Sequence, residues 1–466
     1  MTLFPSSHKA EEQQHEEQFG PNNPQLQAHY ERIRALFGKG DLDAALVELQ
    51  QALQIAPNDP VVHNDIGSFL RRRGRREDLG TAIAQFQEAV RLKPDFALAH
   101  SNLGSTLSQV GQLDEAVAEL REVVRLNPDY AHARNNLAAA LLSRGGDREE
   151  AMRELRAAIR LDPNYAEPHS NLGNALLAGI TETNHGDLDA AIAEFREALR
   201  LVPDYAVARL RLGDALRTKG DWDGAIAEYR ETLKLVPNDP DVHNNLAVVL
   251  GQKGDVQGVV AELREAVRVA PRYPAMRVNL ASVLGQIGDM DGAIAEWREY
   301  LQLMPDDYRA HTALARLYGR KGDASGLIAE CREVLRLKPE DRDALRNLGY
   351  ALSQTGDADG ALAAFRESAR LDPNDPAPHR SIGQILLRSK GDKEGAIAEL
   401  REAMRLKPED ADAHNEFGGI LAFCGRLGEG IAEFREALRL DPQFAEAQKN
   451  LTRALGEKGA TAGASS

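Results

Sequence analysis

Eight histidines recur along the chain at intervals close to 34 residues or multiples of it. Imidazole nitrogens are common zinc ligands, so a regular series of histidines first suggests a row of metal sites. Six asparagines follow the same spacing, and an amide side chain both donates and accepts hydrogen bonds, as a peptide backbone does. The histidines are His29, His63, His100, His169, His243, His311, His379 and His414. The asparagines are Asn102, Asn136, Asn171, Asn245, Asn279 and Asn347.

Prolines mark the limits of a repeat that carries both series. Successive prolines lie 34 to 40 residues apart, and twelve repeats fill residues 26 to 444. A period in this range is typical of a solenoid, in which each repeat packs on its neighbours. The prolines are Pro57, Pro94, Pro128, Pro163, Pro203, Pro237, Pro271, Pro305, Pro339, Pro373, Pro408 and Pro442.

Each repeat contains two helical patterns separated by a turn. In "GDLDAAIAEFREALRLVP", residues 186–203, apolar side chains recur at helical spacing, which predicts the second helix. The Gly-Asp pair before it recurs in eight repeats. Glycine can take the left-handed conformation that ends the first helix, and aspartate can cap the N–H groups that begin the second. The pairs begin at Gly40, Gly186, Gly220, Gly254, Gly288, Gly322, Gly356 and Gly391.

Small residues occupy two fixed places when each repeat is numbered so that its proline is position 32. Position 8 is Gly or Ala in eleven repeats, and position 20 is Ala in nine. Two helices can therefore approach closely there, and a larger side chain would cost about 1–3 kcal/mol by overpacking. Val259 and Leu327 at position 20, and Cys331 at position 24, predict less regular packing in repeats seven and nine.

The pattern of Leu-Gly at 7 and 8, Gly-Asp at the turn, Ala at 20, an aromatic at 24, Ala at 27 and Pro at 32 resembles the tetratricopeptide repeat (TPR) family. The resemblance implies an all-α fold, a right-handed superhelical solenoid of antiparallel helix pairs. We expect a disordered tail at residues 1–24, twelve repeats and a capping helix at 25–459, and a disordered tail at 460–466. Insertions in repeats two, four, five and eleven should lengthen loops or helix ends without breaking the stack.

Helix geometry decides between metal binding and packing for the histidines. Each residue advances about 100° around a helix, which places position 4 (His) and position 8 (Gly) on one face and position 6 (Asn) on the opposite one. The face with Gly must pack, so we expect buried or half-buried imidazoles. Equivalent helices lie about 8–10 Å apart, whereas two nitrogens on one zinc ion lie within about 4 Å. We therefore predict packing residues with a local hydrogen bond, and no metal.

The asparagines at position 6 are candidate binding residues. In TPR folds the first helices line a concave groove, so the resemblance implies an amide ladder along it. An extended peptide rises about 3.3 Å per residue, so one rung every ~10 Å would meet about every third residue. The ladder resembles the one in the repeat half of O-linked N-acetylglucosamine transferases. The plainer alternative is that these amides only keep the face solvated.

Six arginines in repeats nine to eleven lie on or near the same face. Arginine binds carboxylates through paired hydrogen bonds, so an acidic segment or a C-terminal carboxylate could dock there. Asp343, Asp412 and Glu416 lie nearby and could neutralise the patch. The arginines are Arg309, Arg316, Arg320, Arg346, Arg380 and Arg388.

Composition narrows the partners and the compartment. The formal net charge of −15 repels phosphate and anionic lipid, so we expect neither nucleic acid nor membrane as a partner. Two cysteines offer neither a disulfide framework nor a zinc set. We find no run of about 18 apolar residues and no signal-peptide pattern. We therefore expect a cytoplasmic protein.

The sequence lacks the motifs of common enzymes. It contains no phosphate-binding glycine loop, zinc-protease pair or nucleophile elbow, so we predict a non-enzymatic protein without a cofactor. The first interpretation is a protein-protein interaction adaptor or scaffold that binds an extended peptide or partner tail in the concave groove. A self-assembling homo-oligomeric scaffold and a regulatory subunit of a separately encoded enzyme are the alternatives.

Overall fold

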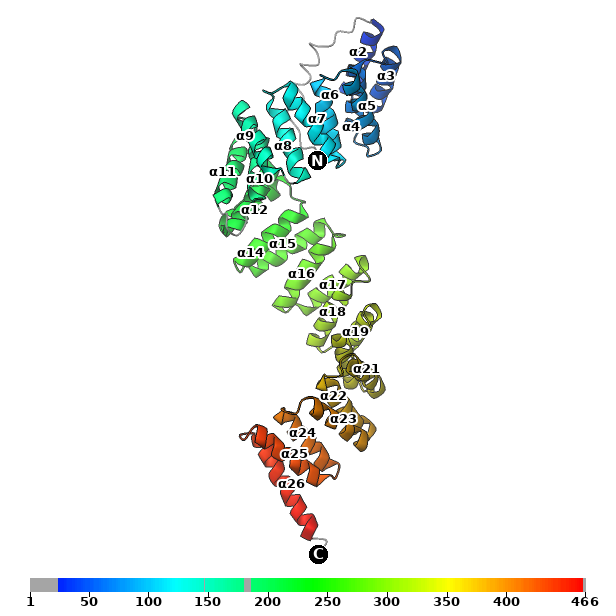
Figure 1. The fold of residues 1–466 in the computed structure, drawn as a ribbon, viewed down its shortest axis with the longest axis vertical. Helices are drawn as coiled ribbons and strands as arrows, with labels where there is room; N and C mark the ends of the chain where they lie inside the picture. The colour runs from blue at the N-terminus through cyan, green and yellow to red at the C-terminus, as the bar shows by residue number, and fades with distance from the viewer. Residues whose placement is uncertain (1–23, 146, 180–185, 464–466) are drawn as a thin grey trace. The chain divides into compact units, whose positions relative to one another are not determined.

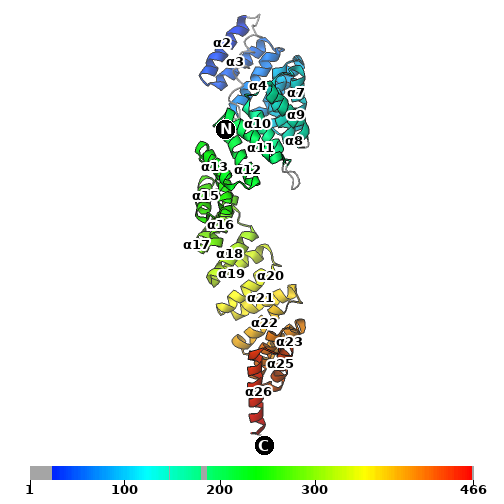
Figure 2. The ribbon, with the colours of Figure 1, turned by 90° about the vertical axis from the view of Figure 1, so that its left-hand side faces the viewer.

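The computed structural model of the chain describes residues 24–145, 147–179 and 186–463. These residues contain α-helices, one short π-helix and no strand, so the fold is all-α (Figure 1). The chain divides into two compact units, Met1–Asp255 and Val256–Ser466. In each unit, consecutive antiparallel helices stack side by side in chain order (Figures 1 and 2). The predicted N-terminal tail at residues 1–24 lies outside the described residues, apart from Pro24.

The first unit holds repeats one to six and the first helix of repeat seven. First helices alternate with second helices along the chain. The first helices are α2 (Pro24–Gly38), α4 (Pro60–Arg73), α6 (Ala97–Gln109), α8 (Ala131–Arg144), α10 (Ala166–Leu177), α12 (Ala206–Lys219) and α14 (Pro240–Gln252). The second helices are α3 (Leu42–Ile55), α5 (Asp78–Leu92), α7 (Leu113–Leu126), α9 (Arg148–Leu161), α11 (Gly186–Leu201) and α13 (Trp222–Leu235).

The second unit continues the same alternation and ends in a helix without a partner repeat. Its first helices are α16 (Pro274–Ile287), α18 (Tyr308–Lys321), α20 (Arg342–Gln354), α22 (Pro376–Ile385) and α24 (Ala411–Phe423). Its second helices are α15 (Val256–Val269), α17 (Met290–Leu303), α19 (Ala324–Leu337), α21 (Ala358–Leu371), α23 (Lys393–Leu406) and α25 (Leu427–Leu440). The last helix is α26 (Ala445–Gly463), and residues 464–466 of the predicted C-terminal tail lie outside the described residues.

The turns inside the repeats follow the Gly-Asp prediction. Seven of the eight predicted glycines have φ between +67° and +90°, a conformation that glycine adopts without strain. The exception, Gly186, is the first residue of α11. The following aspartate accepts a hydrogen bond from a backbone N–H of the next helix in at least six repeats, as Asp323 does from Gly326 at 2.9 Å. The local sequence therefore fixes both ends of the turn.

Small residues set the distance between the two helices of a repeat. The nine alanines at position 20 are completely buried, which confirms the predicted close approach. A Cβ atom added to Gly213 would lie 2.7 Å from the ring of Tyr229, and one added to Gly173 would lie 2.7 Å from the ring of Phe195. The aromatic ring at position 24 thus rests directly on the backbone at position 8. The nine alanines are Ala45, Ala82, Ala116, Ala151, Ala191, Ala225, Ala293, Ala361 and Ala396.

The single-residue insertion in repeat eleven is absorbed inside its first helix. The last turn of that helix is a π-helix, η1 (Leu386–Lys390), which directly follows α22. A π-turn accommodates one extra residue without ending the helix. Gly391 then turns the chain with φ +67°, so the stack continues as predicted. The insertion of repeat five, at residues 179–187, lies largely outside the described residues.

Candidate functional site

The recurring histidines are packing residues. His63, His100, His169, His243, His311 and His414 are buried, and His29 and His379 are half-buried. Each imidazole makes a local hydrogen bond, as His100 Nδ1 does with Glu119 Oε2 at 2.6 Å. Both predictions for position 4, burial and a local hydrogen bond, are therefore confirmed. Within the described residues no group of three or more His, Cys, Asp or Glu side chains is arranged to hold a metal ion.

The asparagine at position 6 bridges consecutive first helices in repeats three, five and seven. Asn102 is only 9% exposed, and its Nδ2 donates to Asn64 Oδ1 at 2.9 Å and to Ser68 Oγ at 3.3 Å. Asn64 stands at position 5 and Ser68 at position 9 of the preceding repeat. The amide of Asn102 is thus committed to the contact between repeats two and three.

The same connection recurs at other repeat boundaries with different side chains. Asn171 Nδ2 donates to Asn135 Oδ1 at 2.9 Å, and Asn245 Nδ2 donates to Asp214 Oδ1 at 3.3 Å. In each case position 6 meets position 5 or position 9 of the repeat before it, and we call this contact a joint. Further joints are Tyr30 to Asp65 at 3.0 Å, Arg380 to Glu416 at 2.7 Å, Ser381 to Tyr350 at 3.4 Å and Asn450 to Asn415 at 3.0 Å.

Sequence reasoning missed the residues that complete these joints. The angular argument placed position 6 opposite the packed face of its own repeat, but it left out the first helix of the previous repeat. A signal was available, because asparagine also occurs at position 5 as Asn64, Asn135, Asn244 and Asn415.

The other three predicted asparagines take part in none of the joints described above. Asn136 is half-buried, and its side chain makes no hydrogen bond or ion pair with any described residue. Asn279 is exposed and is engaged in a contact of its own. Asn347 is exposed and, like Asn136, has no polar partner in the part of the chain that the structure describes.

Four of the six predicted arginines have partners within the protein. Arg346 Nη2 donates to Asp343 Oδ1 at 2.6 Å, and Arg380 Nη2 donates to Glu416 Oε2 at 2.7 Å. Arg320 Nη1 donates to the backbone carbonyl of Gly285 at 3.3 Å. The Arg309 guanidinium carbon lies 5.9 Å from the centre of the Tyr308 ring. Asp343 and Glu416 therefore neutralise part of the patch.

Arg316 and Arg388 remain exposed, with no ion pair to any described residue. Arg316 stands at position 9 of repeat nine, and Asn347 stands at position 6 of repeat ten. These are the two positions that are hydrogen-bonded to each other at the joints of Asn102 with Ser68 and of Asn245 with Asp214. Between repeats nine and ten the hydrogen bond of the joint is not formed, and the side chains of Arg316 and Asn347 are both exposed. We call Arg316 and Asn347 the open joint.

Cys331 lacks the surroundings of a nucleophile. Cys331 is 1% exposed, and burial, followed by the charges of Glu330 and Asp341, raises the pKa of its thiol to about 12. A thiol with that pKa is protonated at neutral pH and reacts slowly. Cys331 therefore serves as a packing residue at the position that most other repeats give to a large side chain.

No helix of the described residues is long and apolar enough to cross a membrane.

Two family profiles match the chain. One, described as TPR repeat, matches residues 75–111, 106–145, 142–178 and 213–254. The other, described as Tetratricopeptide repeat, matches residues 18–60, 244–308, 312–376 and 385–445. Together they span well over half of the sequence. No curated protein matches the chain with significance.

Several solved structures are similar to parts or most of the chain. MamA from Desulfovibrio magneticus RS-1 is 22% identical over 40% of this chain and 99% of its own, with a TM-score of 0.35. TTC0263, a thermophilic TPR protein from Thermus thermophilus, is 25% identical over 40% of this chain and 98% of its own, with a TM-score of 0.35. Yeast Tom70 is 18% identical over 94% of this chain and 96% of its own, with a TM-score of 0.32. At such low TM-scores these likenesses support no inference about function.

Proposed function

Because the chain belongs to the tetratricopeptide repeat family, we propose that it binds an extended, acidic peptide or partner tail along its first helices, with the open joint as the principal contact. Members of this family act as protein-interaction scaffolds and are generally non-enzymatic. The observation that carries the proposal is that Arg316 and Asn347 are both exposed and both without a polar partner among the described residues.

The chemistry of the open joint fits a carboxylate beside a peptide bond. The guanidinium of Arg316 can bind a carboxylate through two parallel hydrogen bonds. The amide of Asn347 can donate to a backbone carbonyl and accept from a backbone N–H. Tyr350, at position 9 of repeat ten, is 45% exposed and offers an aromatic face nearby. An extended acidic segment would satisfy all three groups at once.

In the first unit, Asn136 offers the same amide chemistry without a neighbouring arginine. Position 9 of repeat three is Ser105 and position 5 is Ser101, so this place carries no positive charge of its own. We propose that Asn136 binds the backbone of an extended segment irrespective of its side chains. Asn102, Asn171 and Asn245 hold the repeats together through the joints described above.

The proposed function is tested by measuring how tightly the full chain binds short peptides of defined charge. Peptides rich in Asp and Glu should bind more tightly than Lys-rich peptides of the same length, measured by fluorescence anisotropy at moderate salt. Arg316→Ala should weaken the acidic peptides by about tenfold, because a hydrogen bond to a charged group contributes about 1.5–3 kcal/mol. Asn347→Ala should weaken them by about threefold, because a neutral hydrogen bond contributes about 0.5–1.5 kcal/mol.

Arg332 provides the matched control. It lies in the same repeat but on the second helix α19, where it is exposed and without an ion-pair partner among the described residues. Arg332→Ala changes the net charge by the same amount and should leave peptide binding unchanged. Equal losses from Arg316→Ala and Arg332→Ala would show that only net charge matters and would contradict the proposal. A change in sedimentation of Arg316→Ala without any peptide binding would favour the self-assembling scaffold instead.

A further inference from the structure

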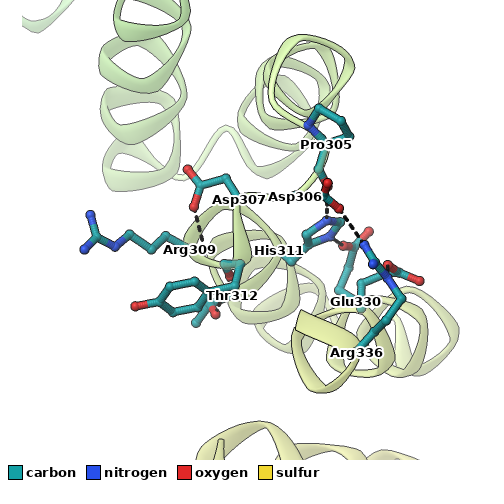
Figure 3. A network of polar contacts seen from close by, with 10 residues as sticks. Pro305, Asp306, Asp307, Arg309, His311, Thr312, Glu330 and Arg336 are labelled. Carbon is teal, nitrogen blue, oxygen red and sulfur yellow. Dashed lines mark hydrogen bonds and ion pairs between the residues drawn. The ribbon is translucent and has the colours of Figure 1, made fainter. Parts of the chain in front are cut away.

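In repeats three, nine and twelve the histidine at position 4 is held by two acceptors at once. His311 Nδ1 lies 2.7 Å from Glu330 Oε2 on α19, and its Nε2 lies 3.2 Å from the carbonyl oxygen of Pro305 (Figure 3). His414 repeats this arrangement with Glu433 at 2.6 Å and the Pro408 carbonyl at 3.1 Å. The carboxylate always comes from position 23 of the same repeat. Where a carbonyl is the second acceptor, it comes from the proline that ends the preceding repeat, as at His63, His100, His243, His311 and His414.

Arginine replaces the histidine in three repeats and makes the same two contacts. Arg134 donates to Glu154 at 2.5 Å and to the Pro128 carbonyl at 2.9 Å. The other two are Arg209, with Glu228 and Pro203 both at 2.8 Å, and Arg277, with Glu296 at 2.8 Å and Pro271 at 3.2 Å. Arginine is always a cation in proteins. Position 4 is therefore a place for a positive charge in these three repeats.

Repeat ten shows what happens when that charge is absent. Its position 4 is Leu345 and its position 23 is Ala364, and both are 6% exposed. Both partners have become apolar together, so neither a carboxylate nor an imidazole is left buried alone. Repeat two is a second variation, in which Gln85 replaces the carboxylate and lies 2.7 Å from His63 Nδ1. Across the repeats of this one chain, an apolar residue at position 4 thus occurs only together with an apolar residue at position 23.

The hydrogen-bond pattern is incompatible with a neutral imidazole beside an ionised carboxylate. A neutral ring has one N–H donor and one bare acceptor nitrogen. If Nε2 donates to the proline carbonyl, Nδ1 would face the carboxylate as acceptor against acceptor, and if Nδ1 donates to the carboxylate, Nε2 would face the carbonyl oxygen in the same way. We infer that these histidines are held as imidazolium ions, and that each one is a proton-dependent clamp joining both helices of its repeat to the end of the preceding repeat.

The other charged groups around the clamp are already paired among themselves. Near His311, Arg336 donates to Glu333 at 2.7 Å and to Asp306 at 2.9 Å, and Asp307 accepts from the hydroxyl of Tyr300 at 2.7 Å. Near His100, Arg125 donates to Glu122 at 2.8 Å. No basic group in the described residues around His311 approaches Glu330 more closely than the imidazole does. The proton on the ring is therefore the charge that balances this carboxylate.

The electrostatics of His100 agree with this arrangement. Burial disfavours the charged ring, but the hydrogen bonds to Glu119 and to the Pro94 carbonyl outweigh burial, so the pKa of His100 is raised above its ordinary value of 6.5. A group with a raised folded pKa stabilises the fold fully below its unfolded pKa. That contribution disappears as the pH rises through the folded pKa. The clamp should accordingly weaken above about pH 6.5.

Histidine-selective ¹⁵N labelling of the full chain tests the protonation state directly. At pH 7 a free imidazole is mostly neutral, because its ordinary pKa is about 6.5. We expect both ring nitrogens of His100, His311 and His414 to carry protons at this pH, with each signal assigned by its own His→Arg variant. His132 supplies an internal reference, because it stands at position 2 and stacks on Tyr165 instead. Observation of an unprotonated ring nitrogen, either Nδ1 or Nε2, in the three clamp histidines at this pH would overturn the inference.

Reciprocal substitutions test the consequence for stability. The urea midpoint of the full chain should be lower at pH 9 than at pH 6. The variant His100→Arg, His311→Arg, His414→Arg should show a smaller decrease, because arginine keeps the clamp closed at both pH values. The opposite variant, Arg134→His, Arg209→His, Arg277→His, should show a larger decrease. The Arg→His variant introduces the residue type that most repeats carry at this position. It therefore tests the clamp even if the His→Arg variant folds poorly. An equal decrease in all three proteins would refute the clamp.

Discussion

At the scale of single residues, the distance between the helices of a repeat depends on the absence of one methyl group. In Gly213→Ala the new Cβ would meet the ring of Tyr229 at 2.7 Å, and that ring is completely buried and cannot move aside. We expect a loss of about 1–3 kcal/mol in the free energy of unfolding, as for other overpacked cores. Urea titration followed by circular dichroism measures the loss.

A second glycine provides the control for this prediction. Gly419 also lies inside a first helix, α24, but a Cβ atom there would meet nothing within 4 Å. Gly419→Ala should be neutral or stabilise the chain by up to about 1 kcal/mol, because alanine is the better helix former. If both substitutions changed the stability equally, the contact between positions 8 and 24 would not set the helix spacing.

At the scale of helices, the aspartate that begins the second helix is the most local stabilising contact. Asp323 accepts from the backbone N–H of Gly326 at 2.9 Å and is half-buried. Asp323→Ala removes this cap and should cost about 0.5–2 kcal/mol. The same titration measures it, and hydrogen exchange at the start of α19 should increase locally.

The helix α7 provides the control, because the side chain of its N-cap residue forms no hydrogen bond with the helix. Its N-cap residue is Gln112, which makes no side-chain cap hydrogen bond. Gln112→Ala should therefore change the stability by less than about 0.5 kcal/mol. A similar loss in both variants would mean that the cap hydrogen bond does not account for the effect of Asp323→Ala.

Helices and turns could be predicted from the sequence because their causes are local. Gly-Asp pairs, alanine at position 20 and the terminal proline each act within a few residues, and the structure has the expected turns at most of them. The joints could not be predicted in the same way. Whether Asn102 is free depends on Asn64, which is 38 residues away. Whether Arg346 or Arg316 is available depends on which carboxylates lie within reach, and that follows from side-chain placement across repeats.

At the scale of the whole molecule, each repeat contacts mainly its neighbours, so removal of one repeat should leave a folded chain. Deletion of residues 308–341 removes repeat nine and joins Asp307 directly to Arg342. Both of these residues already stand at the start of a first helix. We expect a protein with unchanged mean residue ellipticity and a lower unfolding midpoint, because solenoid stability is approximately a sum over repeats and their interfaces.

The same deletion also removes one half of the open joint. Asn347 would then follow repeat eight, whose position 9 is Ser282, and a serine hydroxyl can accept its amide hydrogen. Binding of acidic peptides should be lost while the fold is kept. A collapse of helical content on deletion would show that the second unit folds as an indivisible body.

The joints also limit how the order of the repeats can change when similar segments of the gene recombine. Unequal crossing-over can transpose such segments without altering a single helix. The side chains across each joint nevertheless differ: Asp214 meets Asn245, whereas Arg380 meets Glu416. A recombinant that placed repeat twelve after repeat six would set the carboxylate of Glu416 against that of Asp214. The side chains across each joint are thus complementary only in the present order of the repeats. A chain with shuffled repeats would place like charges together and fold less stably.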